Sequence, residues 1–269
     1  MLKIYTSGKE FLEDNKDILE KYPLETVFFE ANAKYIEKTN KNNFLAKVAV
    51  NGRFLIAVHN ARYPMVLFGD KSLCAEFADG AYKLKLTFDK VLGELETCEA
   101  FLHEYEKLAK CTHEINHSMD IMRCDSVLTD NVEGVEMATE DDIDELTALS
   151  VVFVKEALGD DADIDEVKHS VSSRLSSFRL IRQDGRIVSF ASKKRGTDKL
   201  SCIADVYTLP SYRGQGLSCK VVTALTKQIL DSGKLPYLFV DKTNPVSNHL
   251  YTKIGYTYAV PQYEIKIIR

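Results

Sequence analysis

The chain has 269 residues, of which 45% are hydrophobic and 28% are charged, so it can form one large or two ordinary globular domains. This composition excludes a disordered chain, and the net charge of -5 gives no general attraction to a nucleic acid backbone. The N-terminal segment has no apolar signal core, and no stretch approaches the roughly 18 apolar residues of a membrane span. We therefore expect a cytoplasmic protein without membrane or nucleic acid partners, with its six cysteines reduced.

Helix and strand patterns alternate along the first half of the chain. Apolar spacing over residues 1–40 predicts two helices broken near Pro23. Two strand-like runs, 44–50 and 53–58, are joined by Asn51-Gly52, a two-residue hairpin turn. Beyond this hairpin the pattern predicts strands at 64–68 and 84–88, a long amphipathic helix at 93–110 and a strand at 115–124.

A polar and acidic segment at 125–135 has little apolar periodicity and predicts a linker. We place the boundary between two α/β halves there, giving domains of residues 1–130 and 131–269. In the second half the pattern predicts helices at 140–157 and 164–176, strands at 178–183, 187–194 and 200–208, a helix at 216–231, a strand at 237–241, a short helix at 246–253 and closing strands at 256–268.

A strand, a glycine-containing turn and a helix start follow one another at residues 203–218. Gly214 and Gly216 let the backbone approach a ligand closely, and the N–H groups of the first helical turn favour an anion such as a pyrophosphate. Arg213 adds positive charge. The turn lacks the lysine of a P-loop, and Cys219 stands where a dinucleotide fingerprint needs its third glycine. The alternative to an anion site is a tight turn that binds no ligand and needs glycine only for its backbone angle.

A second motif follows the next predicted strand, where Asn244 precedes Tyr251 by seven residues and a Gly-Tyr pair ends the short helix. The two motifs in this order resemble the GNAT superfamily of CoA-dependent N-acyltransferases over residues 134–269. The family's first motif begins with Gln or Arg, then has glycine after two residues and glycine or alanine two residues later. Here Ser211 replaces the Gln or Arg, which puts one phosphate contact in doubt.

The layout of the whole chain resembles two-domain bacterial GNAT proteins and is similar in plan to glycine N-acyltransferases. This resemblance implies an α/β (α+β) fold of tandem GNAT-like domains, each with a mixed, mostly antiparallel sheet flanked by helices. It also implies that residues 1–130 form a degenerate copy, and that half has no equivalent glycine loop.

The resemblance implies that a primary amine attacks the thioester of acetyl-CoA directly, without a metal. Tyr251 would protonate the departing thiolate, and Asp205, beside the thioester, is the candidate base, with solvent or a bound water as the rival. Asn244 would hold the pantetheine arm, and backbone groups of the preceding strand would pair with its amides. The complete set of candidate donor-binding residues is Val206, Tyr207, Thr208, Arg213, Gly214, Gln215, Gly216, Leu217, Ser218, Asn244, Ser247 and Asn248.

Two other functions are open at this point. His113 to His117 match HExxH, a zinc-protease motif on a helix, but their strand-like alternation separates the two histidines by about 13 Å. A non-catalytic acyl-CoA sensor of the same fold is the second alternative, in which Tyr251 only packs. The acceptor amine, the acyl chain and the role of the first domain have no motif, and a homodimer is compatible with the sequence.

Overall fold

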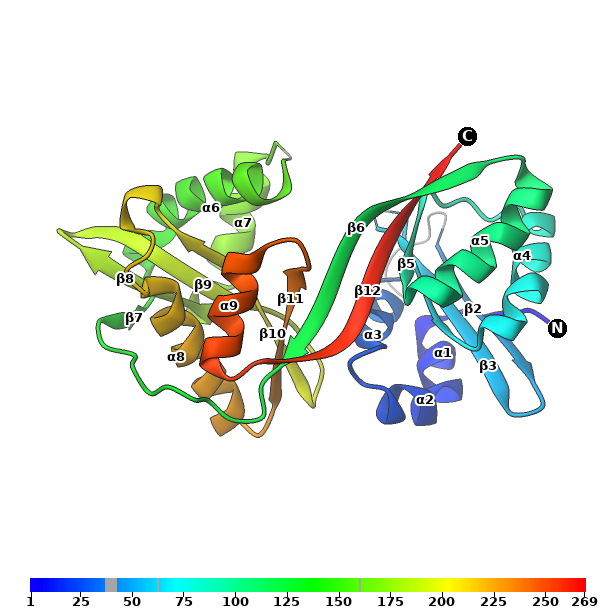
Figure 1. Ribbon diagram of the computed structural model, residues 1–269, viewed down its shortest axis with the longest axis horizontal. Coiled ribbons are helices and arrows are strands. Elements are labelled where there is room, and N and C mark those ends of the chain that lie inside the picture. The colour runs from blue at the N-terminus through cyan, green and yellow to red at the C-terminus, as the bar shows by residue number, and fades with distance from the viewer. Residues whose placement is uncertain (37–42, 62, 160) are drawn as a thin grey trace. The chain divides into compact units, whose positions relative to one another are not determined.

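The computed structural model describes residues 1–36, 43–61, 63–159 and 161–269 (Figure 1). The chain divides into two compact units. Unit 1 comprises residues 1–121, 240–243 and 258–269, and unit 2 comprises residues 122–239 and 244–257. These units are not contiguous halves, because the C-terminal strand belongs to unit 1. The division into domains 1–130 and 131–269 therefore stays a prediction. No helix among the described residues is long and apolar enough to cross a membrane.

Unit 1 is a mostly antiparallel sheet with helices on both faces. Its strands run in the order β1-β2-β3-β4-β5-β12-β6, and β4 and β5 pair in parallel. Its helices are α1 (Gly8–Asp14), α2 (Lys16–Lys21), α3 (Val27–Ile36), α4 (Cys74–Lys83) and α5 (Leu95–Ala109). Its strands are β1 (Lys3–Ile4), β2 (Phe44–Val50), β3 (Arg53–His59), β4 (Met65–Gly69), β5 (Lys90–Gly93), β6 (Thr112–Arg123) and β12 (Thr257–Ile268).

Both faces of the unit 1 sheet are apolar, because successive strand residues point to opposite sides. Phe44 and Ala46 of β2 join the core under α4 and α5, whereas Leu45 between them joins the core under α1 and α3. Neighbouring β3 repeats this alternation with Ala57 and Ile56. The near-continuous apolar runs of these strands are thus explained by helices that cover both faces.

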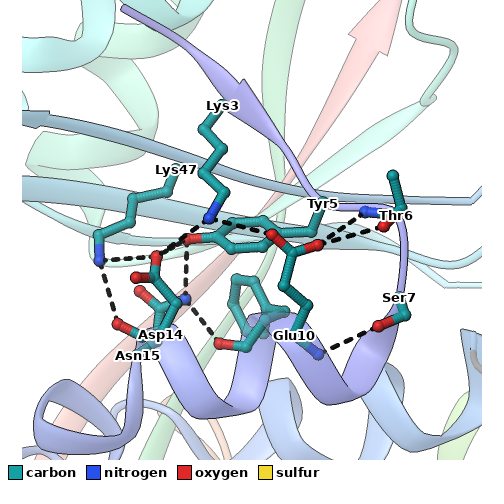
Figure 2. Close-up of polar contacts among 9 residues, drawn as sticks. Lys3, Tyr5, Thr6, Ser7, Glu10, Asp14, Asn15 and Lys47 are labelled. Atoms are coloured by element: carbon teal, nitrogen blue, oxygen red, sulfur yellow. Dashed lines mark hydrogen bonds and ion pairs between the residues drawn. The ribbon is translucent and has the colours of Figure 1, made fainter.

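Charged contacts fasten α1 to the edge of this sheet (Figure 2). Lys3 of β1 lies directly opposite Lys47 of β2, so two like charges meet across the strands. The carboxylates of α1 offset them, since Glu10 lies 3.1 Å from Lys3 and Asp14 lies 3.3 Å from Lys47. The buried Tyr5 donates its hydroxyl to Asp14. These contacts explain why a short helix is held firmly at an edge strand.

Unit 2 contains the sheet that carries the candidate site. Its strands run in the order β11-β10-β9-β8-β7, and among its described strand pairs only β10–β11 is parallel. In Figure 1, α6 and α7 lie on one side of these strands and α8 lies on the other. The elements are β7 (Val135–Met137), α6 (Ile143–Leu158), α7 (Ile164–Ser173), β8 (Phe178–Gln183), β9 (Arg186–Gly196), β10 (Leu200–Thr208), α8 (Leu217–Asp231), β11 (Leu235–Asp241) and α9 (Pro245–Ile254).

The core under α6 and α7 is aromatic. Phe178, Phe190 and Tyr207 of three adjacent strands contact one another and pack against Leu146 of α6 and Val171 of α7. The helix α8 buries its own apolar stripe on the other side of the sheet, through Val221, Val222, Leu225 and Ile229. The predicted fold class, helices flanking a mixed and mostly antiparallel sheet in tandem units, is confirmed.

The predicted elements of the second half match closely, and the strands at 178–183 and 200–208 coincide with β8 and β10. In the first half, the strand predicted at 84–88 is wrong. The N–H of Leu86 bonds to Ala81 and closes α4, a helix that the pattern did not reveal, and the strand β5 comes later. Within the described residues 1–36 the opening segment holds three helices rather than the two predicted, because Asn15 ends α1, and the rest of the predicted range lies outside the described residues. The closing segment is a single strand, β12.

Candidate active site

A bulge in β10 is the first feature of the site. Ala204 pairs with Ser192 of β9 and Tyr207 pairs with Phe190, so β10 advances three residues while β9 advances two. The extra residue is accommodated at Asp205, whose φ is +54°, a conformation uncommon for residues other than glycine. Such bulges redirect a side chain and end regular pairing.

The carboxylate of Asp205 is held by three partners, and its side chain is 11% exposed. Ser192 donates its hydroxyl to Oδ2 at 2.7 Å, Lys194 Nζ lies 2.6 Å from Oδ1, and Arg174 lies 3.5 Å from Oδ2. Arg174 follows α7 and also lies over the ring of Phe178. No local motif marks Ser192, Lys194 or Arg174, and sequence reasoning missed all three.

The strands β10 and β11 pair over only part of their length. Within the described residues, the parallel ladder joins Leu200 to Leu235 and ends where Cys202 meets Tyr237. Strand β10 continues to Thr208 beyond this point. Main-chain groups near Val206 and Thr208 therefore lie past the end of the ladder, where an extended ligand with amide groups can pair with them.

The glycine turn lies between β10 and α8. Gly214 has φ +78° and Gly216 has φ +75°, and a Cβ at either position would meet nothing within 4 Å. The left-handed backbone, rather than crowding within the protein, therefore demands glycine here. The loop is exposed, whereas Leu217 is buried and fixes the start of α8. The first N–H groups of α8 have no intrahelical acceptor and suit an anion.

Three hydroxyl groups connect the end of β10 to this helix start. Ser189 Oγ lies 2.8 Å from Thr208 Oγ1, which lies 2.6 Å from Ser218 Oγ. Ser189 and Thr208 are both buried. The Ser218 hydroxyl is therefore occupied by its bond to Thr208. The group that Ser218 can still offer to an anion is its main-chain N–H.

The side chain of Arg213 is engaged by partners within unit 2. Its Nε donates to the carbonyl of Thr208 at 3.0 Å, its guanidinium pairs with Glu156 of α6, and it lies over the ring of Tyr207. Direct pyrophosphate binding by Arg213 stays a prediction that requires the side chain to leave Glu156.

Asn244, predicted to bind the donor, caps α9, and the predicted residues Ser247 and Asn248 lie within that helix. Asn244 Oδ1 accepts the N–H of Ser247 at 3.1 Å, and Asn248 Nδ2 donates to the carbonyl of Asn244 at 2.7 Å. Pro245 stands at the first helical position, where its missing N–H is harmless. Asn244 is exposed, so its amide group remains accessible to a ligand.

Tyr251 is buried within unit 2, and its ring lies 6.0 Å from that of Tyr256 in an edge-on arrangement. Burial, and to a smaller extent the nearby Cys202 thiol, raises the pKa of Tyr251. Cys202 is also the β10 residue at which the ladder with β11 ends. The phenol therefore stays protonated at neutral pH, which is a condition that the predicted role of proton donor requires.

The segment from His113 to His117 lies within strand β6, which confirms the predicted strand. His113 pairs through Nδ1 with Glu106 of α5 at 2.7 Å. The helical geometry that HExxH needs for zinc is thus absent from this segment. In the described ranges, no group of three or more His, Cys, Asp or Glu side chains is placed to hold a metal ion.

Comparisons with known proteins give a family match and a curated relative for part of the chain. The family model described as FR47-like protein matches residues 187–265. An uncharacterized N-acetyltransferase of Mycobacterium tuberculosis (strain ATCC 25618 / H37Rv) is 33% identical over 76 residues, which are 28% of this chain and 49% of that protein. The match thus spans about half the length of the curated relative.

Solved structures extend the likeness to the whole chain. A GCN5-related N-acetyltransferase from Sphaerobacter thermophilus has a TM-score of 0.63 at 13% identity, covering 100% of this chain and 96% of its own. A tandem GNAT protein from the clavulanic acid biosynthesis pathway has a TM-score of 0.55 at 10% identity, covering 99% and 98%. At these identities the likeness shows the fold, which extends over both units.

Proposed function

We propose that the chain is a GNAT protein of the tandem form and that its unit 2 transfers an acetyl or short acyl group from CoA to a primary amine. The FR47-like match, the N-acetyltransferase relative and the fold shared with tandem GNAT structures support this proposal. The observation that carries the proposal is one arrangement within unit 2. An exposed glycine turn opens α8 after β10, and β10 itself continues to Thr208 past the place where its ladder with β11 stops. Acetyl-CoA has a pyrophosphate for the first feature and pantetheine amides for the second.

Each part of the donor has a proposed partner. Main-chain N–H groups from Gly214 to Ser218 bind the pyrophosphate, supported by the dipole of α8. Val206 and Thr208 pair with the pantetheine amides, and Asn244 holds the same arm. One N–H of β10 polarises the thioester carbonyl as negative charge develops during attack. Tyr251 then gives its proton to the departing thiolate.

Asp205 is our proposed base, acting on the ammonium form of the acceptor. In Asp205→Asn we expect kcat to fall about 100-fold at neutral pH and to recover in part at higher pH, because free amine then accumulates. The free energy of unfolding should also fall by roughly 2 kcal/mol, since Lys194 and Arg174 lose a charged partner. Measured pH profiles of kcat and urea titrations check both.

Lys194→Met is the matched variant for this test. It removes one ion pair but keeps the carboxylate of Asp205. If Asp205 only supports the bulge, both variants lose similar activity and neither recovers at high pH, which would refute its role as the base.

Release of free thiol from acetyl-CoA in the presence of a panel of primary amines tests the proposed function. We expect amine-dependent thiol release together with saturable acetyl-CoA binding in calorimetry. Binding without thiol release for any amine would instead support an acyl-CoA sensor. Absence of binding would reject the donor site itself.

A further inference from the structure

Three basic side chains from separate parts of the sequence meet on the α8 face of the unit 2 sheet. Arg179 of β8 lies opposite Ala191 of β9, and Lys193 stands two residues further along β9 on the same face. Lys234 precedes β11 and donates to the carbonyl of Thr197 at 2.9 Å. We call Arg179, Lys193 and Lys234 the cationic triad.

The triad is only partly exposed and has no acidic partner. All three side chains are half-buried, and among the side chains that the structure describes no carboxylate lies within 4 Å of their charged groups. Their described partners are neutral: Arg179 donates to Gln228 Oε1 at 2.8 Å and to main-chain carbonyls. Other cations of this unit, such as Lys194 and Arg182, are paired with carboxylates.

Lys193 lies close enough to the other two members of the triad to be affected by their charges. Burial, followed by the charges of Arg179 and Lys234, lowers the pKa of Lys193. A set of half-buried cations without a counter-charge lowers the stability of the fold unless something else supplies negative charge. A bound anion would remove this repulsion and would accept hydrogen bonds from all three side chains.

The triad is separate from the donor site. Arg179 contacts Gln228, which is near the C-terminal end of α8, whereas the glycine turn lies at the N-terminal end. A rise of 1.5 Å per residue places these two points about 16 Å apart along the helix. The C-terminal end of a helix repels anions, so the three side chains, rather than main-chain groups, would have to provide the attraction.

We propose that Arg179, Lys193 and Lys234 form a second anion site in unit 2, which binds a phosphate group. Tetrahedral oxyanions have enough acceptor atoms for two ammonium groups and one guanidinium at once. The site would take inorganic phosphate or the phosphate monoester of a small molecule. It is independent of the acyl transfer proposed for the glycine turn.

The test measures the melting temperature and phosphate affinity of the full chain without CoA. Sodium phosphate is compared with sodium chloride at equal ionic strength, and phosphoserine serves as a monoester. We expect phosphate to raise the melting temperature of the wild type. In Lys193→Gln the affinity should fall about tenfold, because one charge-assisted contact is lost. Without phosphate this variant should melt at or above the wild-type temperature, because the repulsion is relieved.

Two controls assign the response to the triad. Lys199→Gln removes the same charge from an exposed lysine of the β9–β10 turn and should keep the phosphate response. Gly216→Val alters the glycine turn and should keep it as well. The proposal is overturned if chloride stabilises as well as phosphate, if Lys193→Gln responds like the wild type, or if the response disappears in Gly216→Val instead. The proposal is also contradicted if phosphoserine binds but inorganic phosphate has no effect. A site that recognises the phosphate group should bind the free ion as well.

Discussion

Replacing Gly216 with valine should weaken acetyl-CoA binding by about 100-fold. Valine would place a branched side chain where the pyrophosphate must approach the N-terminus of α8, removing about two hydrogen bonds to a charged group. The fold itself should tolerate the change, because a Cβ at Gly216 meets nothing within 4 Å. The φ of +75° costs about 1 to 2 kcal/mol for a residue with a side chain. Calorimetric titration of acetyl-CoA measures the affinity.

Gly233 provides the matched control for this substitution. It lies just after the other end of α8 and has a φ of +74°, and a Cβ there would likewise meet nothing within 4 Å. Gly233→Val should therefore lose similar stability yet bind acetyl-CoA like the wild type. Equal loss of affinity in both variants would mean that backbone strain is responsible, and it would remove the support for a pyrophosphate at the glycine turn.

Replacing Tyr251 with phenylalanine should lower kcat about 100-fold and leave the affinity for acetyl-CoA unchanged. The substitution removes only the proton that the phenol gives to the leaving thiolate, and a positioned acid typically contributes this much. Because burial raises the pKa of Tyr251, its acid form persists to higher pH than that of a free tyrosine. Deprotonation of Tyr251 should therefore not lower the wild-type kcat at any pH below about 10.

Tyr256→Phe separates this chemical role from packing. Tyr256 is a neighbouring buried tyrosine whose hydroxyl lies 2.8 Å from Thr226 Oγ1. Its variant should lose about 1 kcal/mol of stability and keep its kcat. Undiminished thiol release by Tyr251→Phe would show that Tyr251 serves only to pack the helix α9.

The candidate donor site was predictable because its parts are local. A glycine turn between a strand and a helix implies exposed N–H groups wherever it occurs, and Gly214 and Gly216 both take the left-handed backbone expected of them. The turn at Asn51-Gly52 located the strands on either side of it for the same reason, since neighbours in the sequence determine a two-residue hairpin turn. Two spaced motifs then carried the resemblance to the GNAT superfamily.

Contacts between distant segments were decided only by the tertiary structure. The extra residue at Asp205 depends on how β10 pairs with β9, and its partners Arg174 and Lys194 reach it from other elements. Arg213 turns toward Glu156 because α6 packs beside the end of β10, which no local pattern indicates. The C-terminal strand completes unit 1 rather than the half that precedes it. Periodicity along a chain reports which face a residue occupies, whereas the partners across that face depend on strand order and register.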